Sequence, residues 1–198
     1  MNDLFGKLHF ILLLGETGSG KGVFANHYYR GLVTKYSADK LKFLFLDMTG
    51  VDYKLLDSPY LYKKTITSPE LAIKELEGIA NNDFSGHKLI VHIEEADMVY
   101  HDKDRLESAL FNIINKDNIT VIFSTSRLDP EYLDKWLQYA GLRIIFKLSN
   151  EADSKYLAGS DIACKLEPGR KILIAKNASI VLPPLSKKEA EKNRELTL

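Results

Sequence analysis

The sequence predicts an α/β fold in which a mostly parallel β-sheet is covered by helices on both faces. Short apolar runs alternate along the chain with segments whose apolar residues recur every three or four positions, an alternation that is typical of strand–helix–strand units. The apolar runs are continuous, which indicates strands buried on both faces, as in a parallel sheet. After Gly169 the pattern changes to two short apolar runs, which predict a C-terminal β-hairpin.

Each expected element follows from a local pattern. The parallel strands are expected at residues 10–14, 43–46, 89–93, 121–123 and 144–146, and the hairpin at residues 171–175 and 179–182, divided by Asn177. One helix is expected from the glycine-rich loop through Tyr36. Two more begin at Pro69 and Pro130, because proline is favoured in the first turn of a helix. A fourth is expected between residues 103 and 116, where apolar residues fall at helical spacing.

Composition excludes several classes of protein. The chain has 198 residues, 45% of them hydrophobic, with 27 basic and 27 acidic side chains and a formal net charge of zero. This balance excludes a disordered chain, and it excludes nucleic-acid binding through overall charge alone. The N-terminal apolar run is far shorter than the ~20 residues of a membrane span, and it ends in Gly15 without the cleavage site of a secretory signal. The single cysteine, Cys164, forms no internal disulfide, so we expect a cytoplasmic protein without a membrane segment.

A glycine-rich loop follows the first expected strand and opens the first expected helix, which is the context of a phosphate-binding P-loop. Glycines allow successive backbone N–H groups to turn toward phosphate oxygens, and the helix N terminus adds a partial positive charge. Lys21 is expected to reach the β- and γ-phosphates of ATP. The predicted nucleotide-binding residues are Gly15, Glu16, Thr17, Gly18, Ser19, Gly20, Lys21, Gly22 and Val23. A glycine-rich turn without a ligand is the alternative.

Gly22 departs from the usual pattern at the position after the lysine, where a Ser or Thr hydroxyl ligates Mg²⁺. Water can take that coordination position, because Mg²⁺ keeps several waters. Binding of ATP and Mg²⁺ is therefore expected, while the efficiency of hydrolysis stays open. Thr17 and Ser19 also lie in the loop, but the sequence assigns neither of them to the metal.

Two carboxylates, Glu94 and Glu95, follow the third expected strand. In P-loop ATPases an acid at this position, usually Asp, holds the Mg²⁺ shell, and an adjacent Glu polarises the attacking water. We therefore expect Glu94 to be the metal-side acid and Glu95 to be the catalytic base, with Asp97 as a second candidate for the metal. The alternative is that strand ends often carry exposed acids. His92 is expected to be a buried residue of the strand.

The fourth expected strand leads into small polar residues and an arginine at residues 124–127. Ligands of α/β folds collect at the carboxyl ends of the strands, so Ser126 and Arg127 are candidates for sensing the γ-phosphate. The start of an ordinary loop is equally consistent with this composition. Together with Lys21, Glu94 and Glu95, these two residues complete the predicted catalytic set.

The chain as a whole resembles the motor domain of the FtsK/SpoIIIE family of DNA translocases, within the HerA–FtsK group of P-loop ATPases. Beyond the P-loop, the resemblance rests on the strand that ends in Asp47, the Pro59 turn, residues 119–127, residues 142–146 with the Asp-Ser segment at residues 153–157, and the closing hairpin after Glu167. It spans about residues 8–185, and the Asp-Ser segment is its most family-specific part. The ATPase domain is accordingly expected at residues 1–185, and residues 186–198 form a charged tail.

The resemblance implies a RecA-like core that assembles into a hexameric ring around double-stranded DNA, contacted mainly through phosphates and without sequence specificity. It also implies ATP bound between subunits, with an arginine from one subunit reaching the nucleotide of the next. Where the family has the arginine, this sequence has Asn115, and where the family has a glutamine at the end of the fourth strand, it has Ser126. Gly22 and Glu94 also differ from the family pattern, so four positions with a chemical role depart from it. The membrane-anchoring and DNA-reading segments of full-length relatives are absent, so we expect a small stand-alone homologue or a fragment.

Three functions are compatible with these features. An ATP-driven DNA translocase, acting in segregation, transfer or packaging, accounts for the whole-chain resemblance and the paired motifs. A degenerate subunit that binds nucleotide and hydrolyses it weakly accounts for Gly22 and Asn115. A small-molecule P-loop kinase is the third, although the sequence has no arginine cluster for a lid. Lys103, Arg105 and Lys116 are candidates for DNA contacts, with a solvated helix surface as the alternative.

Overall fold

The predicted α/β architecture with a mostly parallel sheet is confirmed. The computed structural model describes residues 8–53, 57–83, 86–175 and 178–192, which form one seven-stranded sheet in the order β2-β3-β4-β1-β5-β6-β7. The strands are β1 Phe10–Leu14, β2 Leu41–Asp47, β3 Lys88–Glu94, β4 Ile119–Thr125, β5 Leu142–Ile145, β6 Lys171–Ala175 and β7 Ala178–Leu182. The first five strands pair in parallel, and β6 and β7 are added antiparallel. The turn at Asn177 lies outside the described residues.

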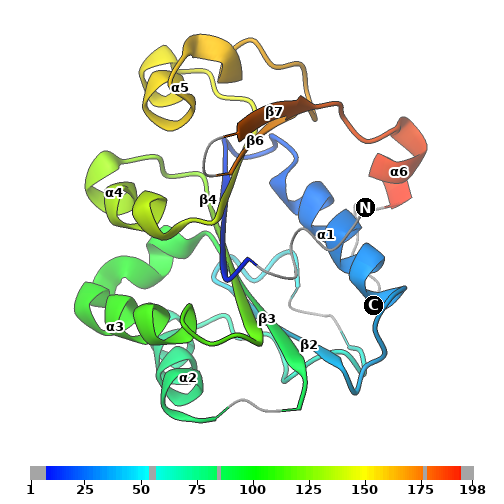
Figure 1. Ribbon diagram of the computed structural model, residues 1–198, viewed down its shortest axis with the longest axis vertical. Helices are drawn as coiled ribbons and strands as arrows, with labels where there is room; N and C mark the ends of the chain where they lie inside the picture. Colours follow the sequence, from blue (N-terminus) through cyan, green and yellow to red (C-terminus); the bar gives the residue numbers. More distant parts are fainter. Residues whose placement is uncertain (1–7, 54–56, 84–85, 176–177, 193–198) are drawn as a thin grey trace.

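Helices cover both faces of the sheet. The helices are α1 Lys21–Val33, α2 Pro69–Asn81, α3 Lys103–Ile113, α4 Pro130–Tyr139, α5 Glu151–Ala158 and α6 Lys187–Lys192. Figure 1 shows α2, α3, α4 and α5 on one face and α1 and α6 on the other. Two short 3₁₀ helices, η1 Ala96–Asp102 and η2 Asp161–Ala163, were not expected from the sequence. The first helix ends at Val33 rather than Tyr36, because a tight turn follows in which Lys35 N–H donates to Leu32 O.

Successive residues of each central strand bury their side chains on opposite faces of the sheet. Leu12 of β1 belongs to the core under α2, α3 and α4, whereas Ile11 belongs to the core under α1. In the first core the Trp136 ring lies 5.7 Å from Phe10 and 5.4 Å from Phe123 between centroids. Fully burying one such aromatic or aliphatic side chain stabilises the fold by about 1.5–3 kcal/mol. Continuous apolar strands therefore become strands that are buried on both sides.

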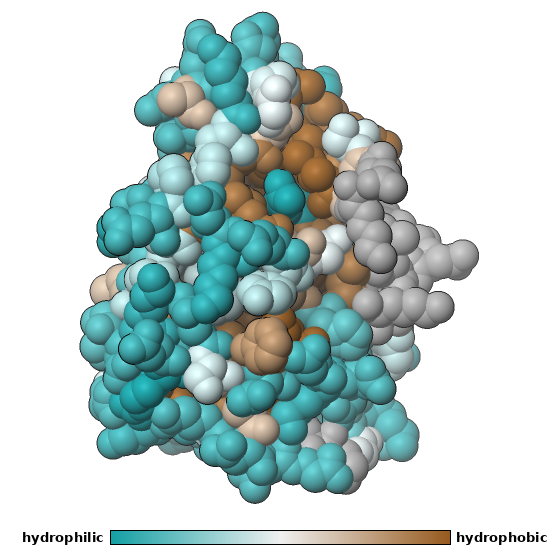
Figure 2. Space-filling model, turned by 60° about the vertical axis from the view of Figure 1, so that its left-hand side comes forward, coloured by the Kyte–Doolittle hydropathy of each residue, from teal (hydrophilic) through white to brown (hydrophobic). Residues whose placement is uncertain are grey.

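The two edges of the sheet differ in how they are protected. On the β2 edge, Phe43 N–H donates to Tyr60 O at 2.8 Å and Asp47 N–H donates to Ile66 O at 2.9 Å, so the connecting segment covers the strand. On the other edge, β7 exposes Ile180 to 59%. Figure 2 shows a surface that is hydrophilic over most of this view, with apolar side chains gathered in its upper half. Among the described residues, no helix combines the length and apolar character that crossing a membrane requires.

The Asp-Ser segment in α5 has a structural role. Ser154 is fully buried, and its hydroxyl donates to Ser160 O at 2.7 Å and accepts from Ala163 N–H at 3.0 Å. These bonds fix η2 against the end of α5, where Gly159 ends the helix in the left-handed conformation. The segment that carries the most specific part of the family resemblance therefore holds the chain together at this point.

Asp47 has a similar structural role at the end of β2. Its buried carboxylate accepts hydrogen bonds from Thr49 N–H and Oγ1, from Gly50 N–H, and from the N–H groups of Asp52 and Tyr53, all between 2.7 and 3.1 Å. One side chain thus satisfies five hydrogen-bond donors of the following loop. An acid at this edge of the sheet is therefore explained by the loop that it holds.

Asp47→Ala is expected to lower the free energy of unfolding by about 2–4 kcal/mol, because it leaves several loop donors without their acceptor. Urea denaturation followed by circular dichroism measures this quantity. Asp52→Ala is the control, since it removes an exposed carboxylate from the same loop. An Asp47→Ala variant as stable as Asp52→Ala would contradict the structural role.

Candidate active site

The glycine-rich loop forms a cradle at the N terminus of α1. Gly18 and Gly20 have φ angles of 78° and 104°, in the left-handed region that glycine adopts without strain. Ser19 N–H donates to Glu16 O at 3.1 Å and closes the turn. The first turn of α1 contains no acidic side chain, so the free N–H groups and the positive end of the helix dipole remain available to an anion.

Lys21 is held inside this cradle. The residue is only 6% exposed, and its ammonium donates to Gly15 O at 2.7 Å and to Glu16 O at 3.3 Å. Both acceptors are neutral carbonyls, whereas a phosphate oxygen would offer a stronger charge-assisted bond at the same place. The ammonium is therefore positioned to exchange these carbonyls for phosphate oxygens.

The loop after β5 fixes the outer side of the cradle. The Glu16 carboxylate accepts from Ser149 N–H at 2.6 Å and from Ser149 Oγ at 2.8 Å. A Cβ at Gly15 would lie 2.8 Å from both Phe146 Cβ and Ser19 Oγ, so only glycine permits this close approach. Glu16 and Gly15 therefore serve to shape the loop.

Gly22 has room for a side chain. A Cβ built at this position meets no atom within 4 Å among the described residues, in contrast to Gly15. Packing therefore does not require the absence of the hydroxyl that the usual pattern places here. The departure at Gly22 is a chemical difference and not a steric necessity.

The sheet order brings the acidic pair to the same edge as the cradle. β4 lies between β1 and β3, pairing Leu14 with Thr125 on one side and Phe123 with Ile93 on the other. Because these strands are parallel, their carboxyl ends meet at one edge, as Figure 1 shows. The phosphate loop after β1 and the acids at the end of β3 therefore flank the end of β4.

Glu94 is a buried carboxylate that stays ionised. It is 6% exposed and accepts from His92 Nε2 at 2.7 Å. Burial raises the pKa of the Glu94 carboxyl, but the His92 hydrogen bond, the Ser124 hydroxyl and the charge of Lys21 outweigh burial and hold the pKa below its ordinary value. The influence of Lys21 on this pKa reflects the proximity of the two groups. Glu94 is thus a charged oxygen donor beside the cradle.

Glu95 is held in a strained conformation by the end of β4. Its φ of 47° is the one positive value among non-glycine residues in the described part of the chain, and such strain is concentrated at functional sites. Its Oε2 accepts from Ser126 N–H at 3.0 Å and from Ser126 Oγ at 2.9 Å. The structure therefore brings Ser126 and Glu95 together and leaves Oε1 of Glu95 for a further hydrogen bond.

Arg127 and Asp97 have other partners. The Arg127 guanidinium donates to Asp129 at 3.2 Å, with 56% of its side chain exposed. Asp97 accepts from Thr125 Oγ1 at 3.1 Å. A role for Arg127 in sensing phosphate, and for Asp97 at the metal, stays a prediction.

The three basic residues predicted to contact DNA all have contacts within the chain, and the Lys103 ammonium lies 5.6 Å from the centroid of the Tyr100 ring. Arg105 forms ion pairs with Glu77 at 2.7 Å, Asp102 at 3.1 Å and Glu70 at 3.3 Å. Lys116 donates to Asn82 O at 2.8 Å. With three carboxylates around it, Arg105 is a poor candidate for binding a phosphate.

Sequence reasoning missed the partners of His92. The residue is buried in β3, as expected, but it bridges Glu94 and the Tyr29 hydroxyl of α1. Tyr29 lies 63 residues before His92, and no local pattern links the two. The only signal in the sequence that could have placed Tyr29 near the site is its position about two helical turns after Lys21 in the same expected helix.

The oxygen donors near the cradle fit Mg²⁺. This cation is held by one or two carboxylates together with phosphate oxygens and waters, and Glu94 supplies a carboxylate. The buried Ser19 Oγ has no hydrogen-bond partner among the described residues, and a metal-bound water or a phosphate would supply one. In the described ranges no group of three or more His, Cys, Asp or Glu residues could hold a metal by itself, so the phosphates would complete the coordination.

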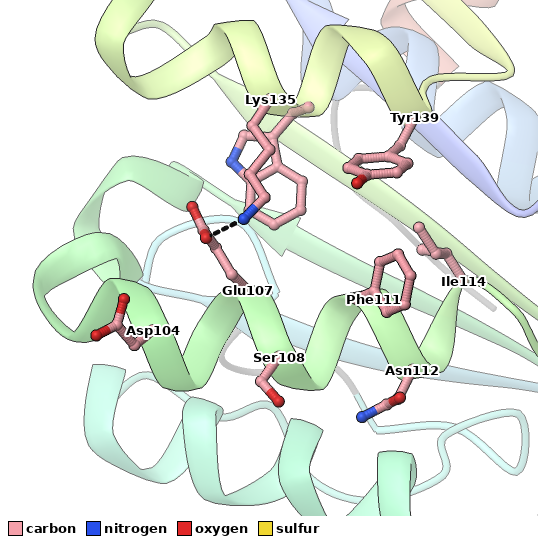
Figure 3. Close-up of a pocket in the computed structure, with 9 residues that line it drawn as sticks. Asp104, Glu107, Ser108, Phe111, Asn112, Ile114, Lys135 and Tyr139 are labelled. Carbon is pink, nitrogen blue, oxygen red and sulfur yellow. Dashed lines mark hydrogen bonds and ion pairs between the residues drawn. The ribbon is translucent and has the colours of Figure 1, made fainter.

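A groove of about 330 Å³ lies between α3 and α4. Figure 3 shows the aromatic rings of Phe111 and Tyr139 and the ion pair between Lys135 and Glu107 along it. None of the residues predicted for the site lines this groove. The residues predicted for the site therefore lie at the strand ends and not along this groove.

Comparison with known proteins agrees with this geometry. A family model described as the FtsK/SpoIIIE family matches residues 3–83. The DNA translocase FtsK of Helicobacter pylori (strain J99 / ATCC 700824) is 37% identical over 75 residues, which are 37% of this chain and 9% of that protein. The matched segment thus spans about a tenth of the length of this relative.

Two solved structures share the fold. The genome packaging NTPase B204 of Sulfolobus turreted icosahedral virus 2, in complex with ATPγS, has a TM-score of 0.68 at 17% identity, covering 90% of this chain and 98% of that one. The pCW3 conjugation coupling protein TcpA, in its monomer form with ATPγS, has a TM-score of 0.68 at 18% identity, covering 96% of this chain and 66% of that one. The resemblance to the FtsK/SpoIIIE family that the sequence predicts is thus confirmed over residues 3–83, and the fold of the chain is that of these RecA-like P-loop proteins.

Proposed function

We propose that the chain is an ATP-driven motor subunit that moves double-stranded DNA. One observation carries the proposal: Lys21 in the phosphate cradle and the Glu94–Glu95 pair lie at the same sheet edge, with Glu95 held by Ser126 of the intervening strand end. The relatives' names support DNA as the substrate, since they describe a DNA translocase, a conjugation coupling protein and a genome packaging NTPase.

Each residue has a defined task in hydrolysis. The loop N–H groups and Lys21 bind the β- and γ-phosphates, and phosphoryl transfer depends mainly on such positioning and on electrostatic stabilisation. Mg²⁺, when bound with the nucleotide, offsets the charge that develops on the phosphates. Glu94 holds the hydrated metal, and Oε1 of Glu95 accepts a hydrogen bond from the attacking water while Ser126 fixes Oε2. Arg127 is the candidate for sensing the γ-phosphate.

Oligomerisation and DNA binding are part of the same proposal. The chain acts in the cytoplasm as a homo-oligomer, a hexameric ring in which DNA is contacted through its phosphates. Because the formal net charge is zero, DNA binding depends on a local basic surface in the assembled ring.

A second function is favoured by a specific observation. Gly22 lacks the hydroxyl that ligates Mg²⁺. Asn115, which follows α3, stands where the family has an arginine, and its side chain donates to Phe111 O of that helix. A degenerate subunit that binds nucleotide and hydrolyses it weakly would carry these departures. No observation favours the small-molecule kinase.

Lys21→Ala is expected to abolish a DNA-stimulated ATPase activity, with nucleotide affinity lowered by about 10- to 100-fold because a charge-assisted phosphate contact is lost. The measurement is the ATP turnover rate with and without long duplex DNA. Lys74→Ala, which removes an exposed lysine of α2, is the matched control. A parent rate that ignores DNA would contradict the motor function, and a Lys21→Ala rate equal to that of the parent would contradict the site.

Gly22→Ser is expected to raise the Mg²⁺-dependent hydrolysis rate by about tenfold, because it restores a metal ligand in a space that is open. Gly22→Ala fills the same space without a hydroxyl and is the matched control. A large gain specific to serine, over a parent rate near background, favours the degenerate subunit. Equal rates in Gly22→Ser and Gly22→Ala would show that the missing hydroxyl does not limit hydrolysis.

Glu95→Gln is expected to lower kcat by about 10²–10⁴-fold, because the amide cannot accept a proton from the attacking water. ATP affinity should stay close to that of the parent, since Glu95 does not touch the cradle in the proposed arrangement. Single-turnover hydrolysis and fluorescent-nucleotide binding separate the two effects. Glu131→Gln, on the exposed surface of α4, is the control; a Glu95→Gln variant with an unchanged kcat would exclude the base role.

A further inference from the structure

A buried chain of hydrogen bonds stands behind the Glu94 carboxylate. The Tyr29 hydroxyl of α1 contacts Nδ1 of His92, and Nε2 of His92 lies 2.7 Å from Oε2 of Glu94. Tyr29 and His92 are 0% and 1% exposed. These hydrogen bonds join the helix that begins at Lys21 to the strand that ends at Glu94.

The ionised carboxylate of Glu94 decides the direction of its hydrogen bond with His92, and the tautomer of a neutral imidazole decides the direction of the other. An ionised carboxylate can only accept, so Nε2 of His92 carries the proton that is donated to Glu94. Nδ1 of a neutral imidazole is then an acceptor, and the Tyr29 hydroxyl donates to it. Burial, followed by the neighbouring Tyr53 and Tyr28, raises the pKa of Tyr29, so its hydroxyl keeps the proton. In these two hydrogen bonds each donor therefore faces an acceptor.

Aromatic packing prevents the imidazole from turning. The His92 ring lies 5.3 Å from Tyr53 and 6.2 Å from Phe45 between centroids. The Tyr29 ring packs edge-on against Phe43 at 5.2 Å and against Phe45 at 5.5 Å. Both rings are thus fixed by contacts that are independent of the hydrogen bonds. A rotation of His92 would break its bond to Glu94 and also disturb this packing.

Glutamate needs such a support more than aspartate does. At the metal-side position P-loop ATPases usually carry Asp, and Glu94 adds one methylene and one rotatable bond. An orienting donor removes that rotational freedom, in the way that groups behind a metal ligand fix its orientation. We propose that Tyr29 and His92 are positioning residues that hold the Glu94 carboxylate in the orientation required by the hydrated Mg²⁺ of the bound nucleotide. This inference rests on the proposed function of Glu94 as the metal-side acid.

The test measures metal affinity separately from nucleotide affinity. ATPγS binding to the full chain is measured by calorimetry without metal, and Mn²⁺ binding to the ATPγS complex by electron paramagnetic resonance. His92→Leu is expected to weaken Mn²⁺ binding by roughly 10- to 100-fold, with metal-free ATPγS affinity changed less than about threefold. Tyr29→Phe, which removes one oxygen, is expected to weaken Mn²⁺ binding by roughly 3- to 10-fold.

Two further variants separate positioning from packing. The side-chain amide of His92→Gln can replace Nε2–H, so Mn²⁺ affinity should recover to near the parent value. Tyr28→Phe removes a hydroxyl from the adjacent helical position and should leave Mn²⁺ affinity unchanged. In a Glu94→Asp background, which withdraws the carboxylate from His92, the further change His92→Leu should have little effect, since coupled residues are non-additive.

The measurements distinguish failure of the positioning role from failure of the proposed function. If the parent binds ATPγS and Mn²⁺, and His92→Leu and Tyr29→Phe both retain the parent Mn²⁺ affinity, the positioning role is overturned while the site stands. If the variants lose metal-free ATPγS binding to the same extent as Mn²⁺ binding, the Tyr29–His92–Glu94 hydrogen bonds only support the fold, and the inference is wrong. If His92→Leu does not fold, Tyr29→Phe and His92→Gln give the same decision. A parent that binds no ATPγS overturns the proposed function and this inference together.

Discussion

The parallel pairing of β1, β4 and β3 is the constraint on which the site depends. With β4 inserted between the other two strands, the phosphate loop, the polar end of β4 and the acidic pair are placed side by side at one edge. Ser126 can then reach Glu95, and Lys21 lies close enough to affect the pKa of Glu94. Both cores support this pairing, because the central strands are buried on both faces.

The electrostatics of this edge support the divalent cation of the proposed function. The charge of Lys21 helps to lower the pKa of Glu94, whereas burial, followed by the charges of Glu94 and Asp47, raises the pKa of Asp52. A triphosphate would add further negative charge at the same place. In the proposed function Glu94 would hold a divalent cation, whose charge would offset this repulsion. Asp47 has a different role at this edge, because its oxygens accept hydrogen bonds from the loop that follows β2.

The sequence predicted what local patterns encode. Continuous apolar runs identified the strands, and the glycine-rich loop before a helix identified the cradle. It could not predict contacts between distant residues, such as Tyr29 with His92 or Glu95 with Ser126, since these depend on the order of strands in the sheet. The apolar residue Leu71 of α2 is 56% exposed, because the buried stripe of this helix begins at Ala72. The family match ends at residue 83, before the Asp-Ser segment, whose serine the structure explains by local hydrogen bonds.

The most direct measurement is a crystal structure of the chain with ATPγS and Mg²⁺. The account predicts that Lys21 Nζ leaves the carbonyls of Gly15 and Glu16 for phosphate oxygens, and that the water shell of the metal contacts Glu94. Oε1 of Glu95 should face the γ-phosphate while Ser126 still holds Oε2. A nucleotide bound away from the glycine-rich loop, or bound there with both carboxylates directed away from its phosphates, would contradict the account.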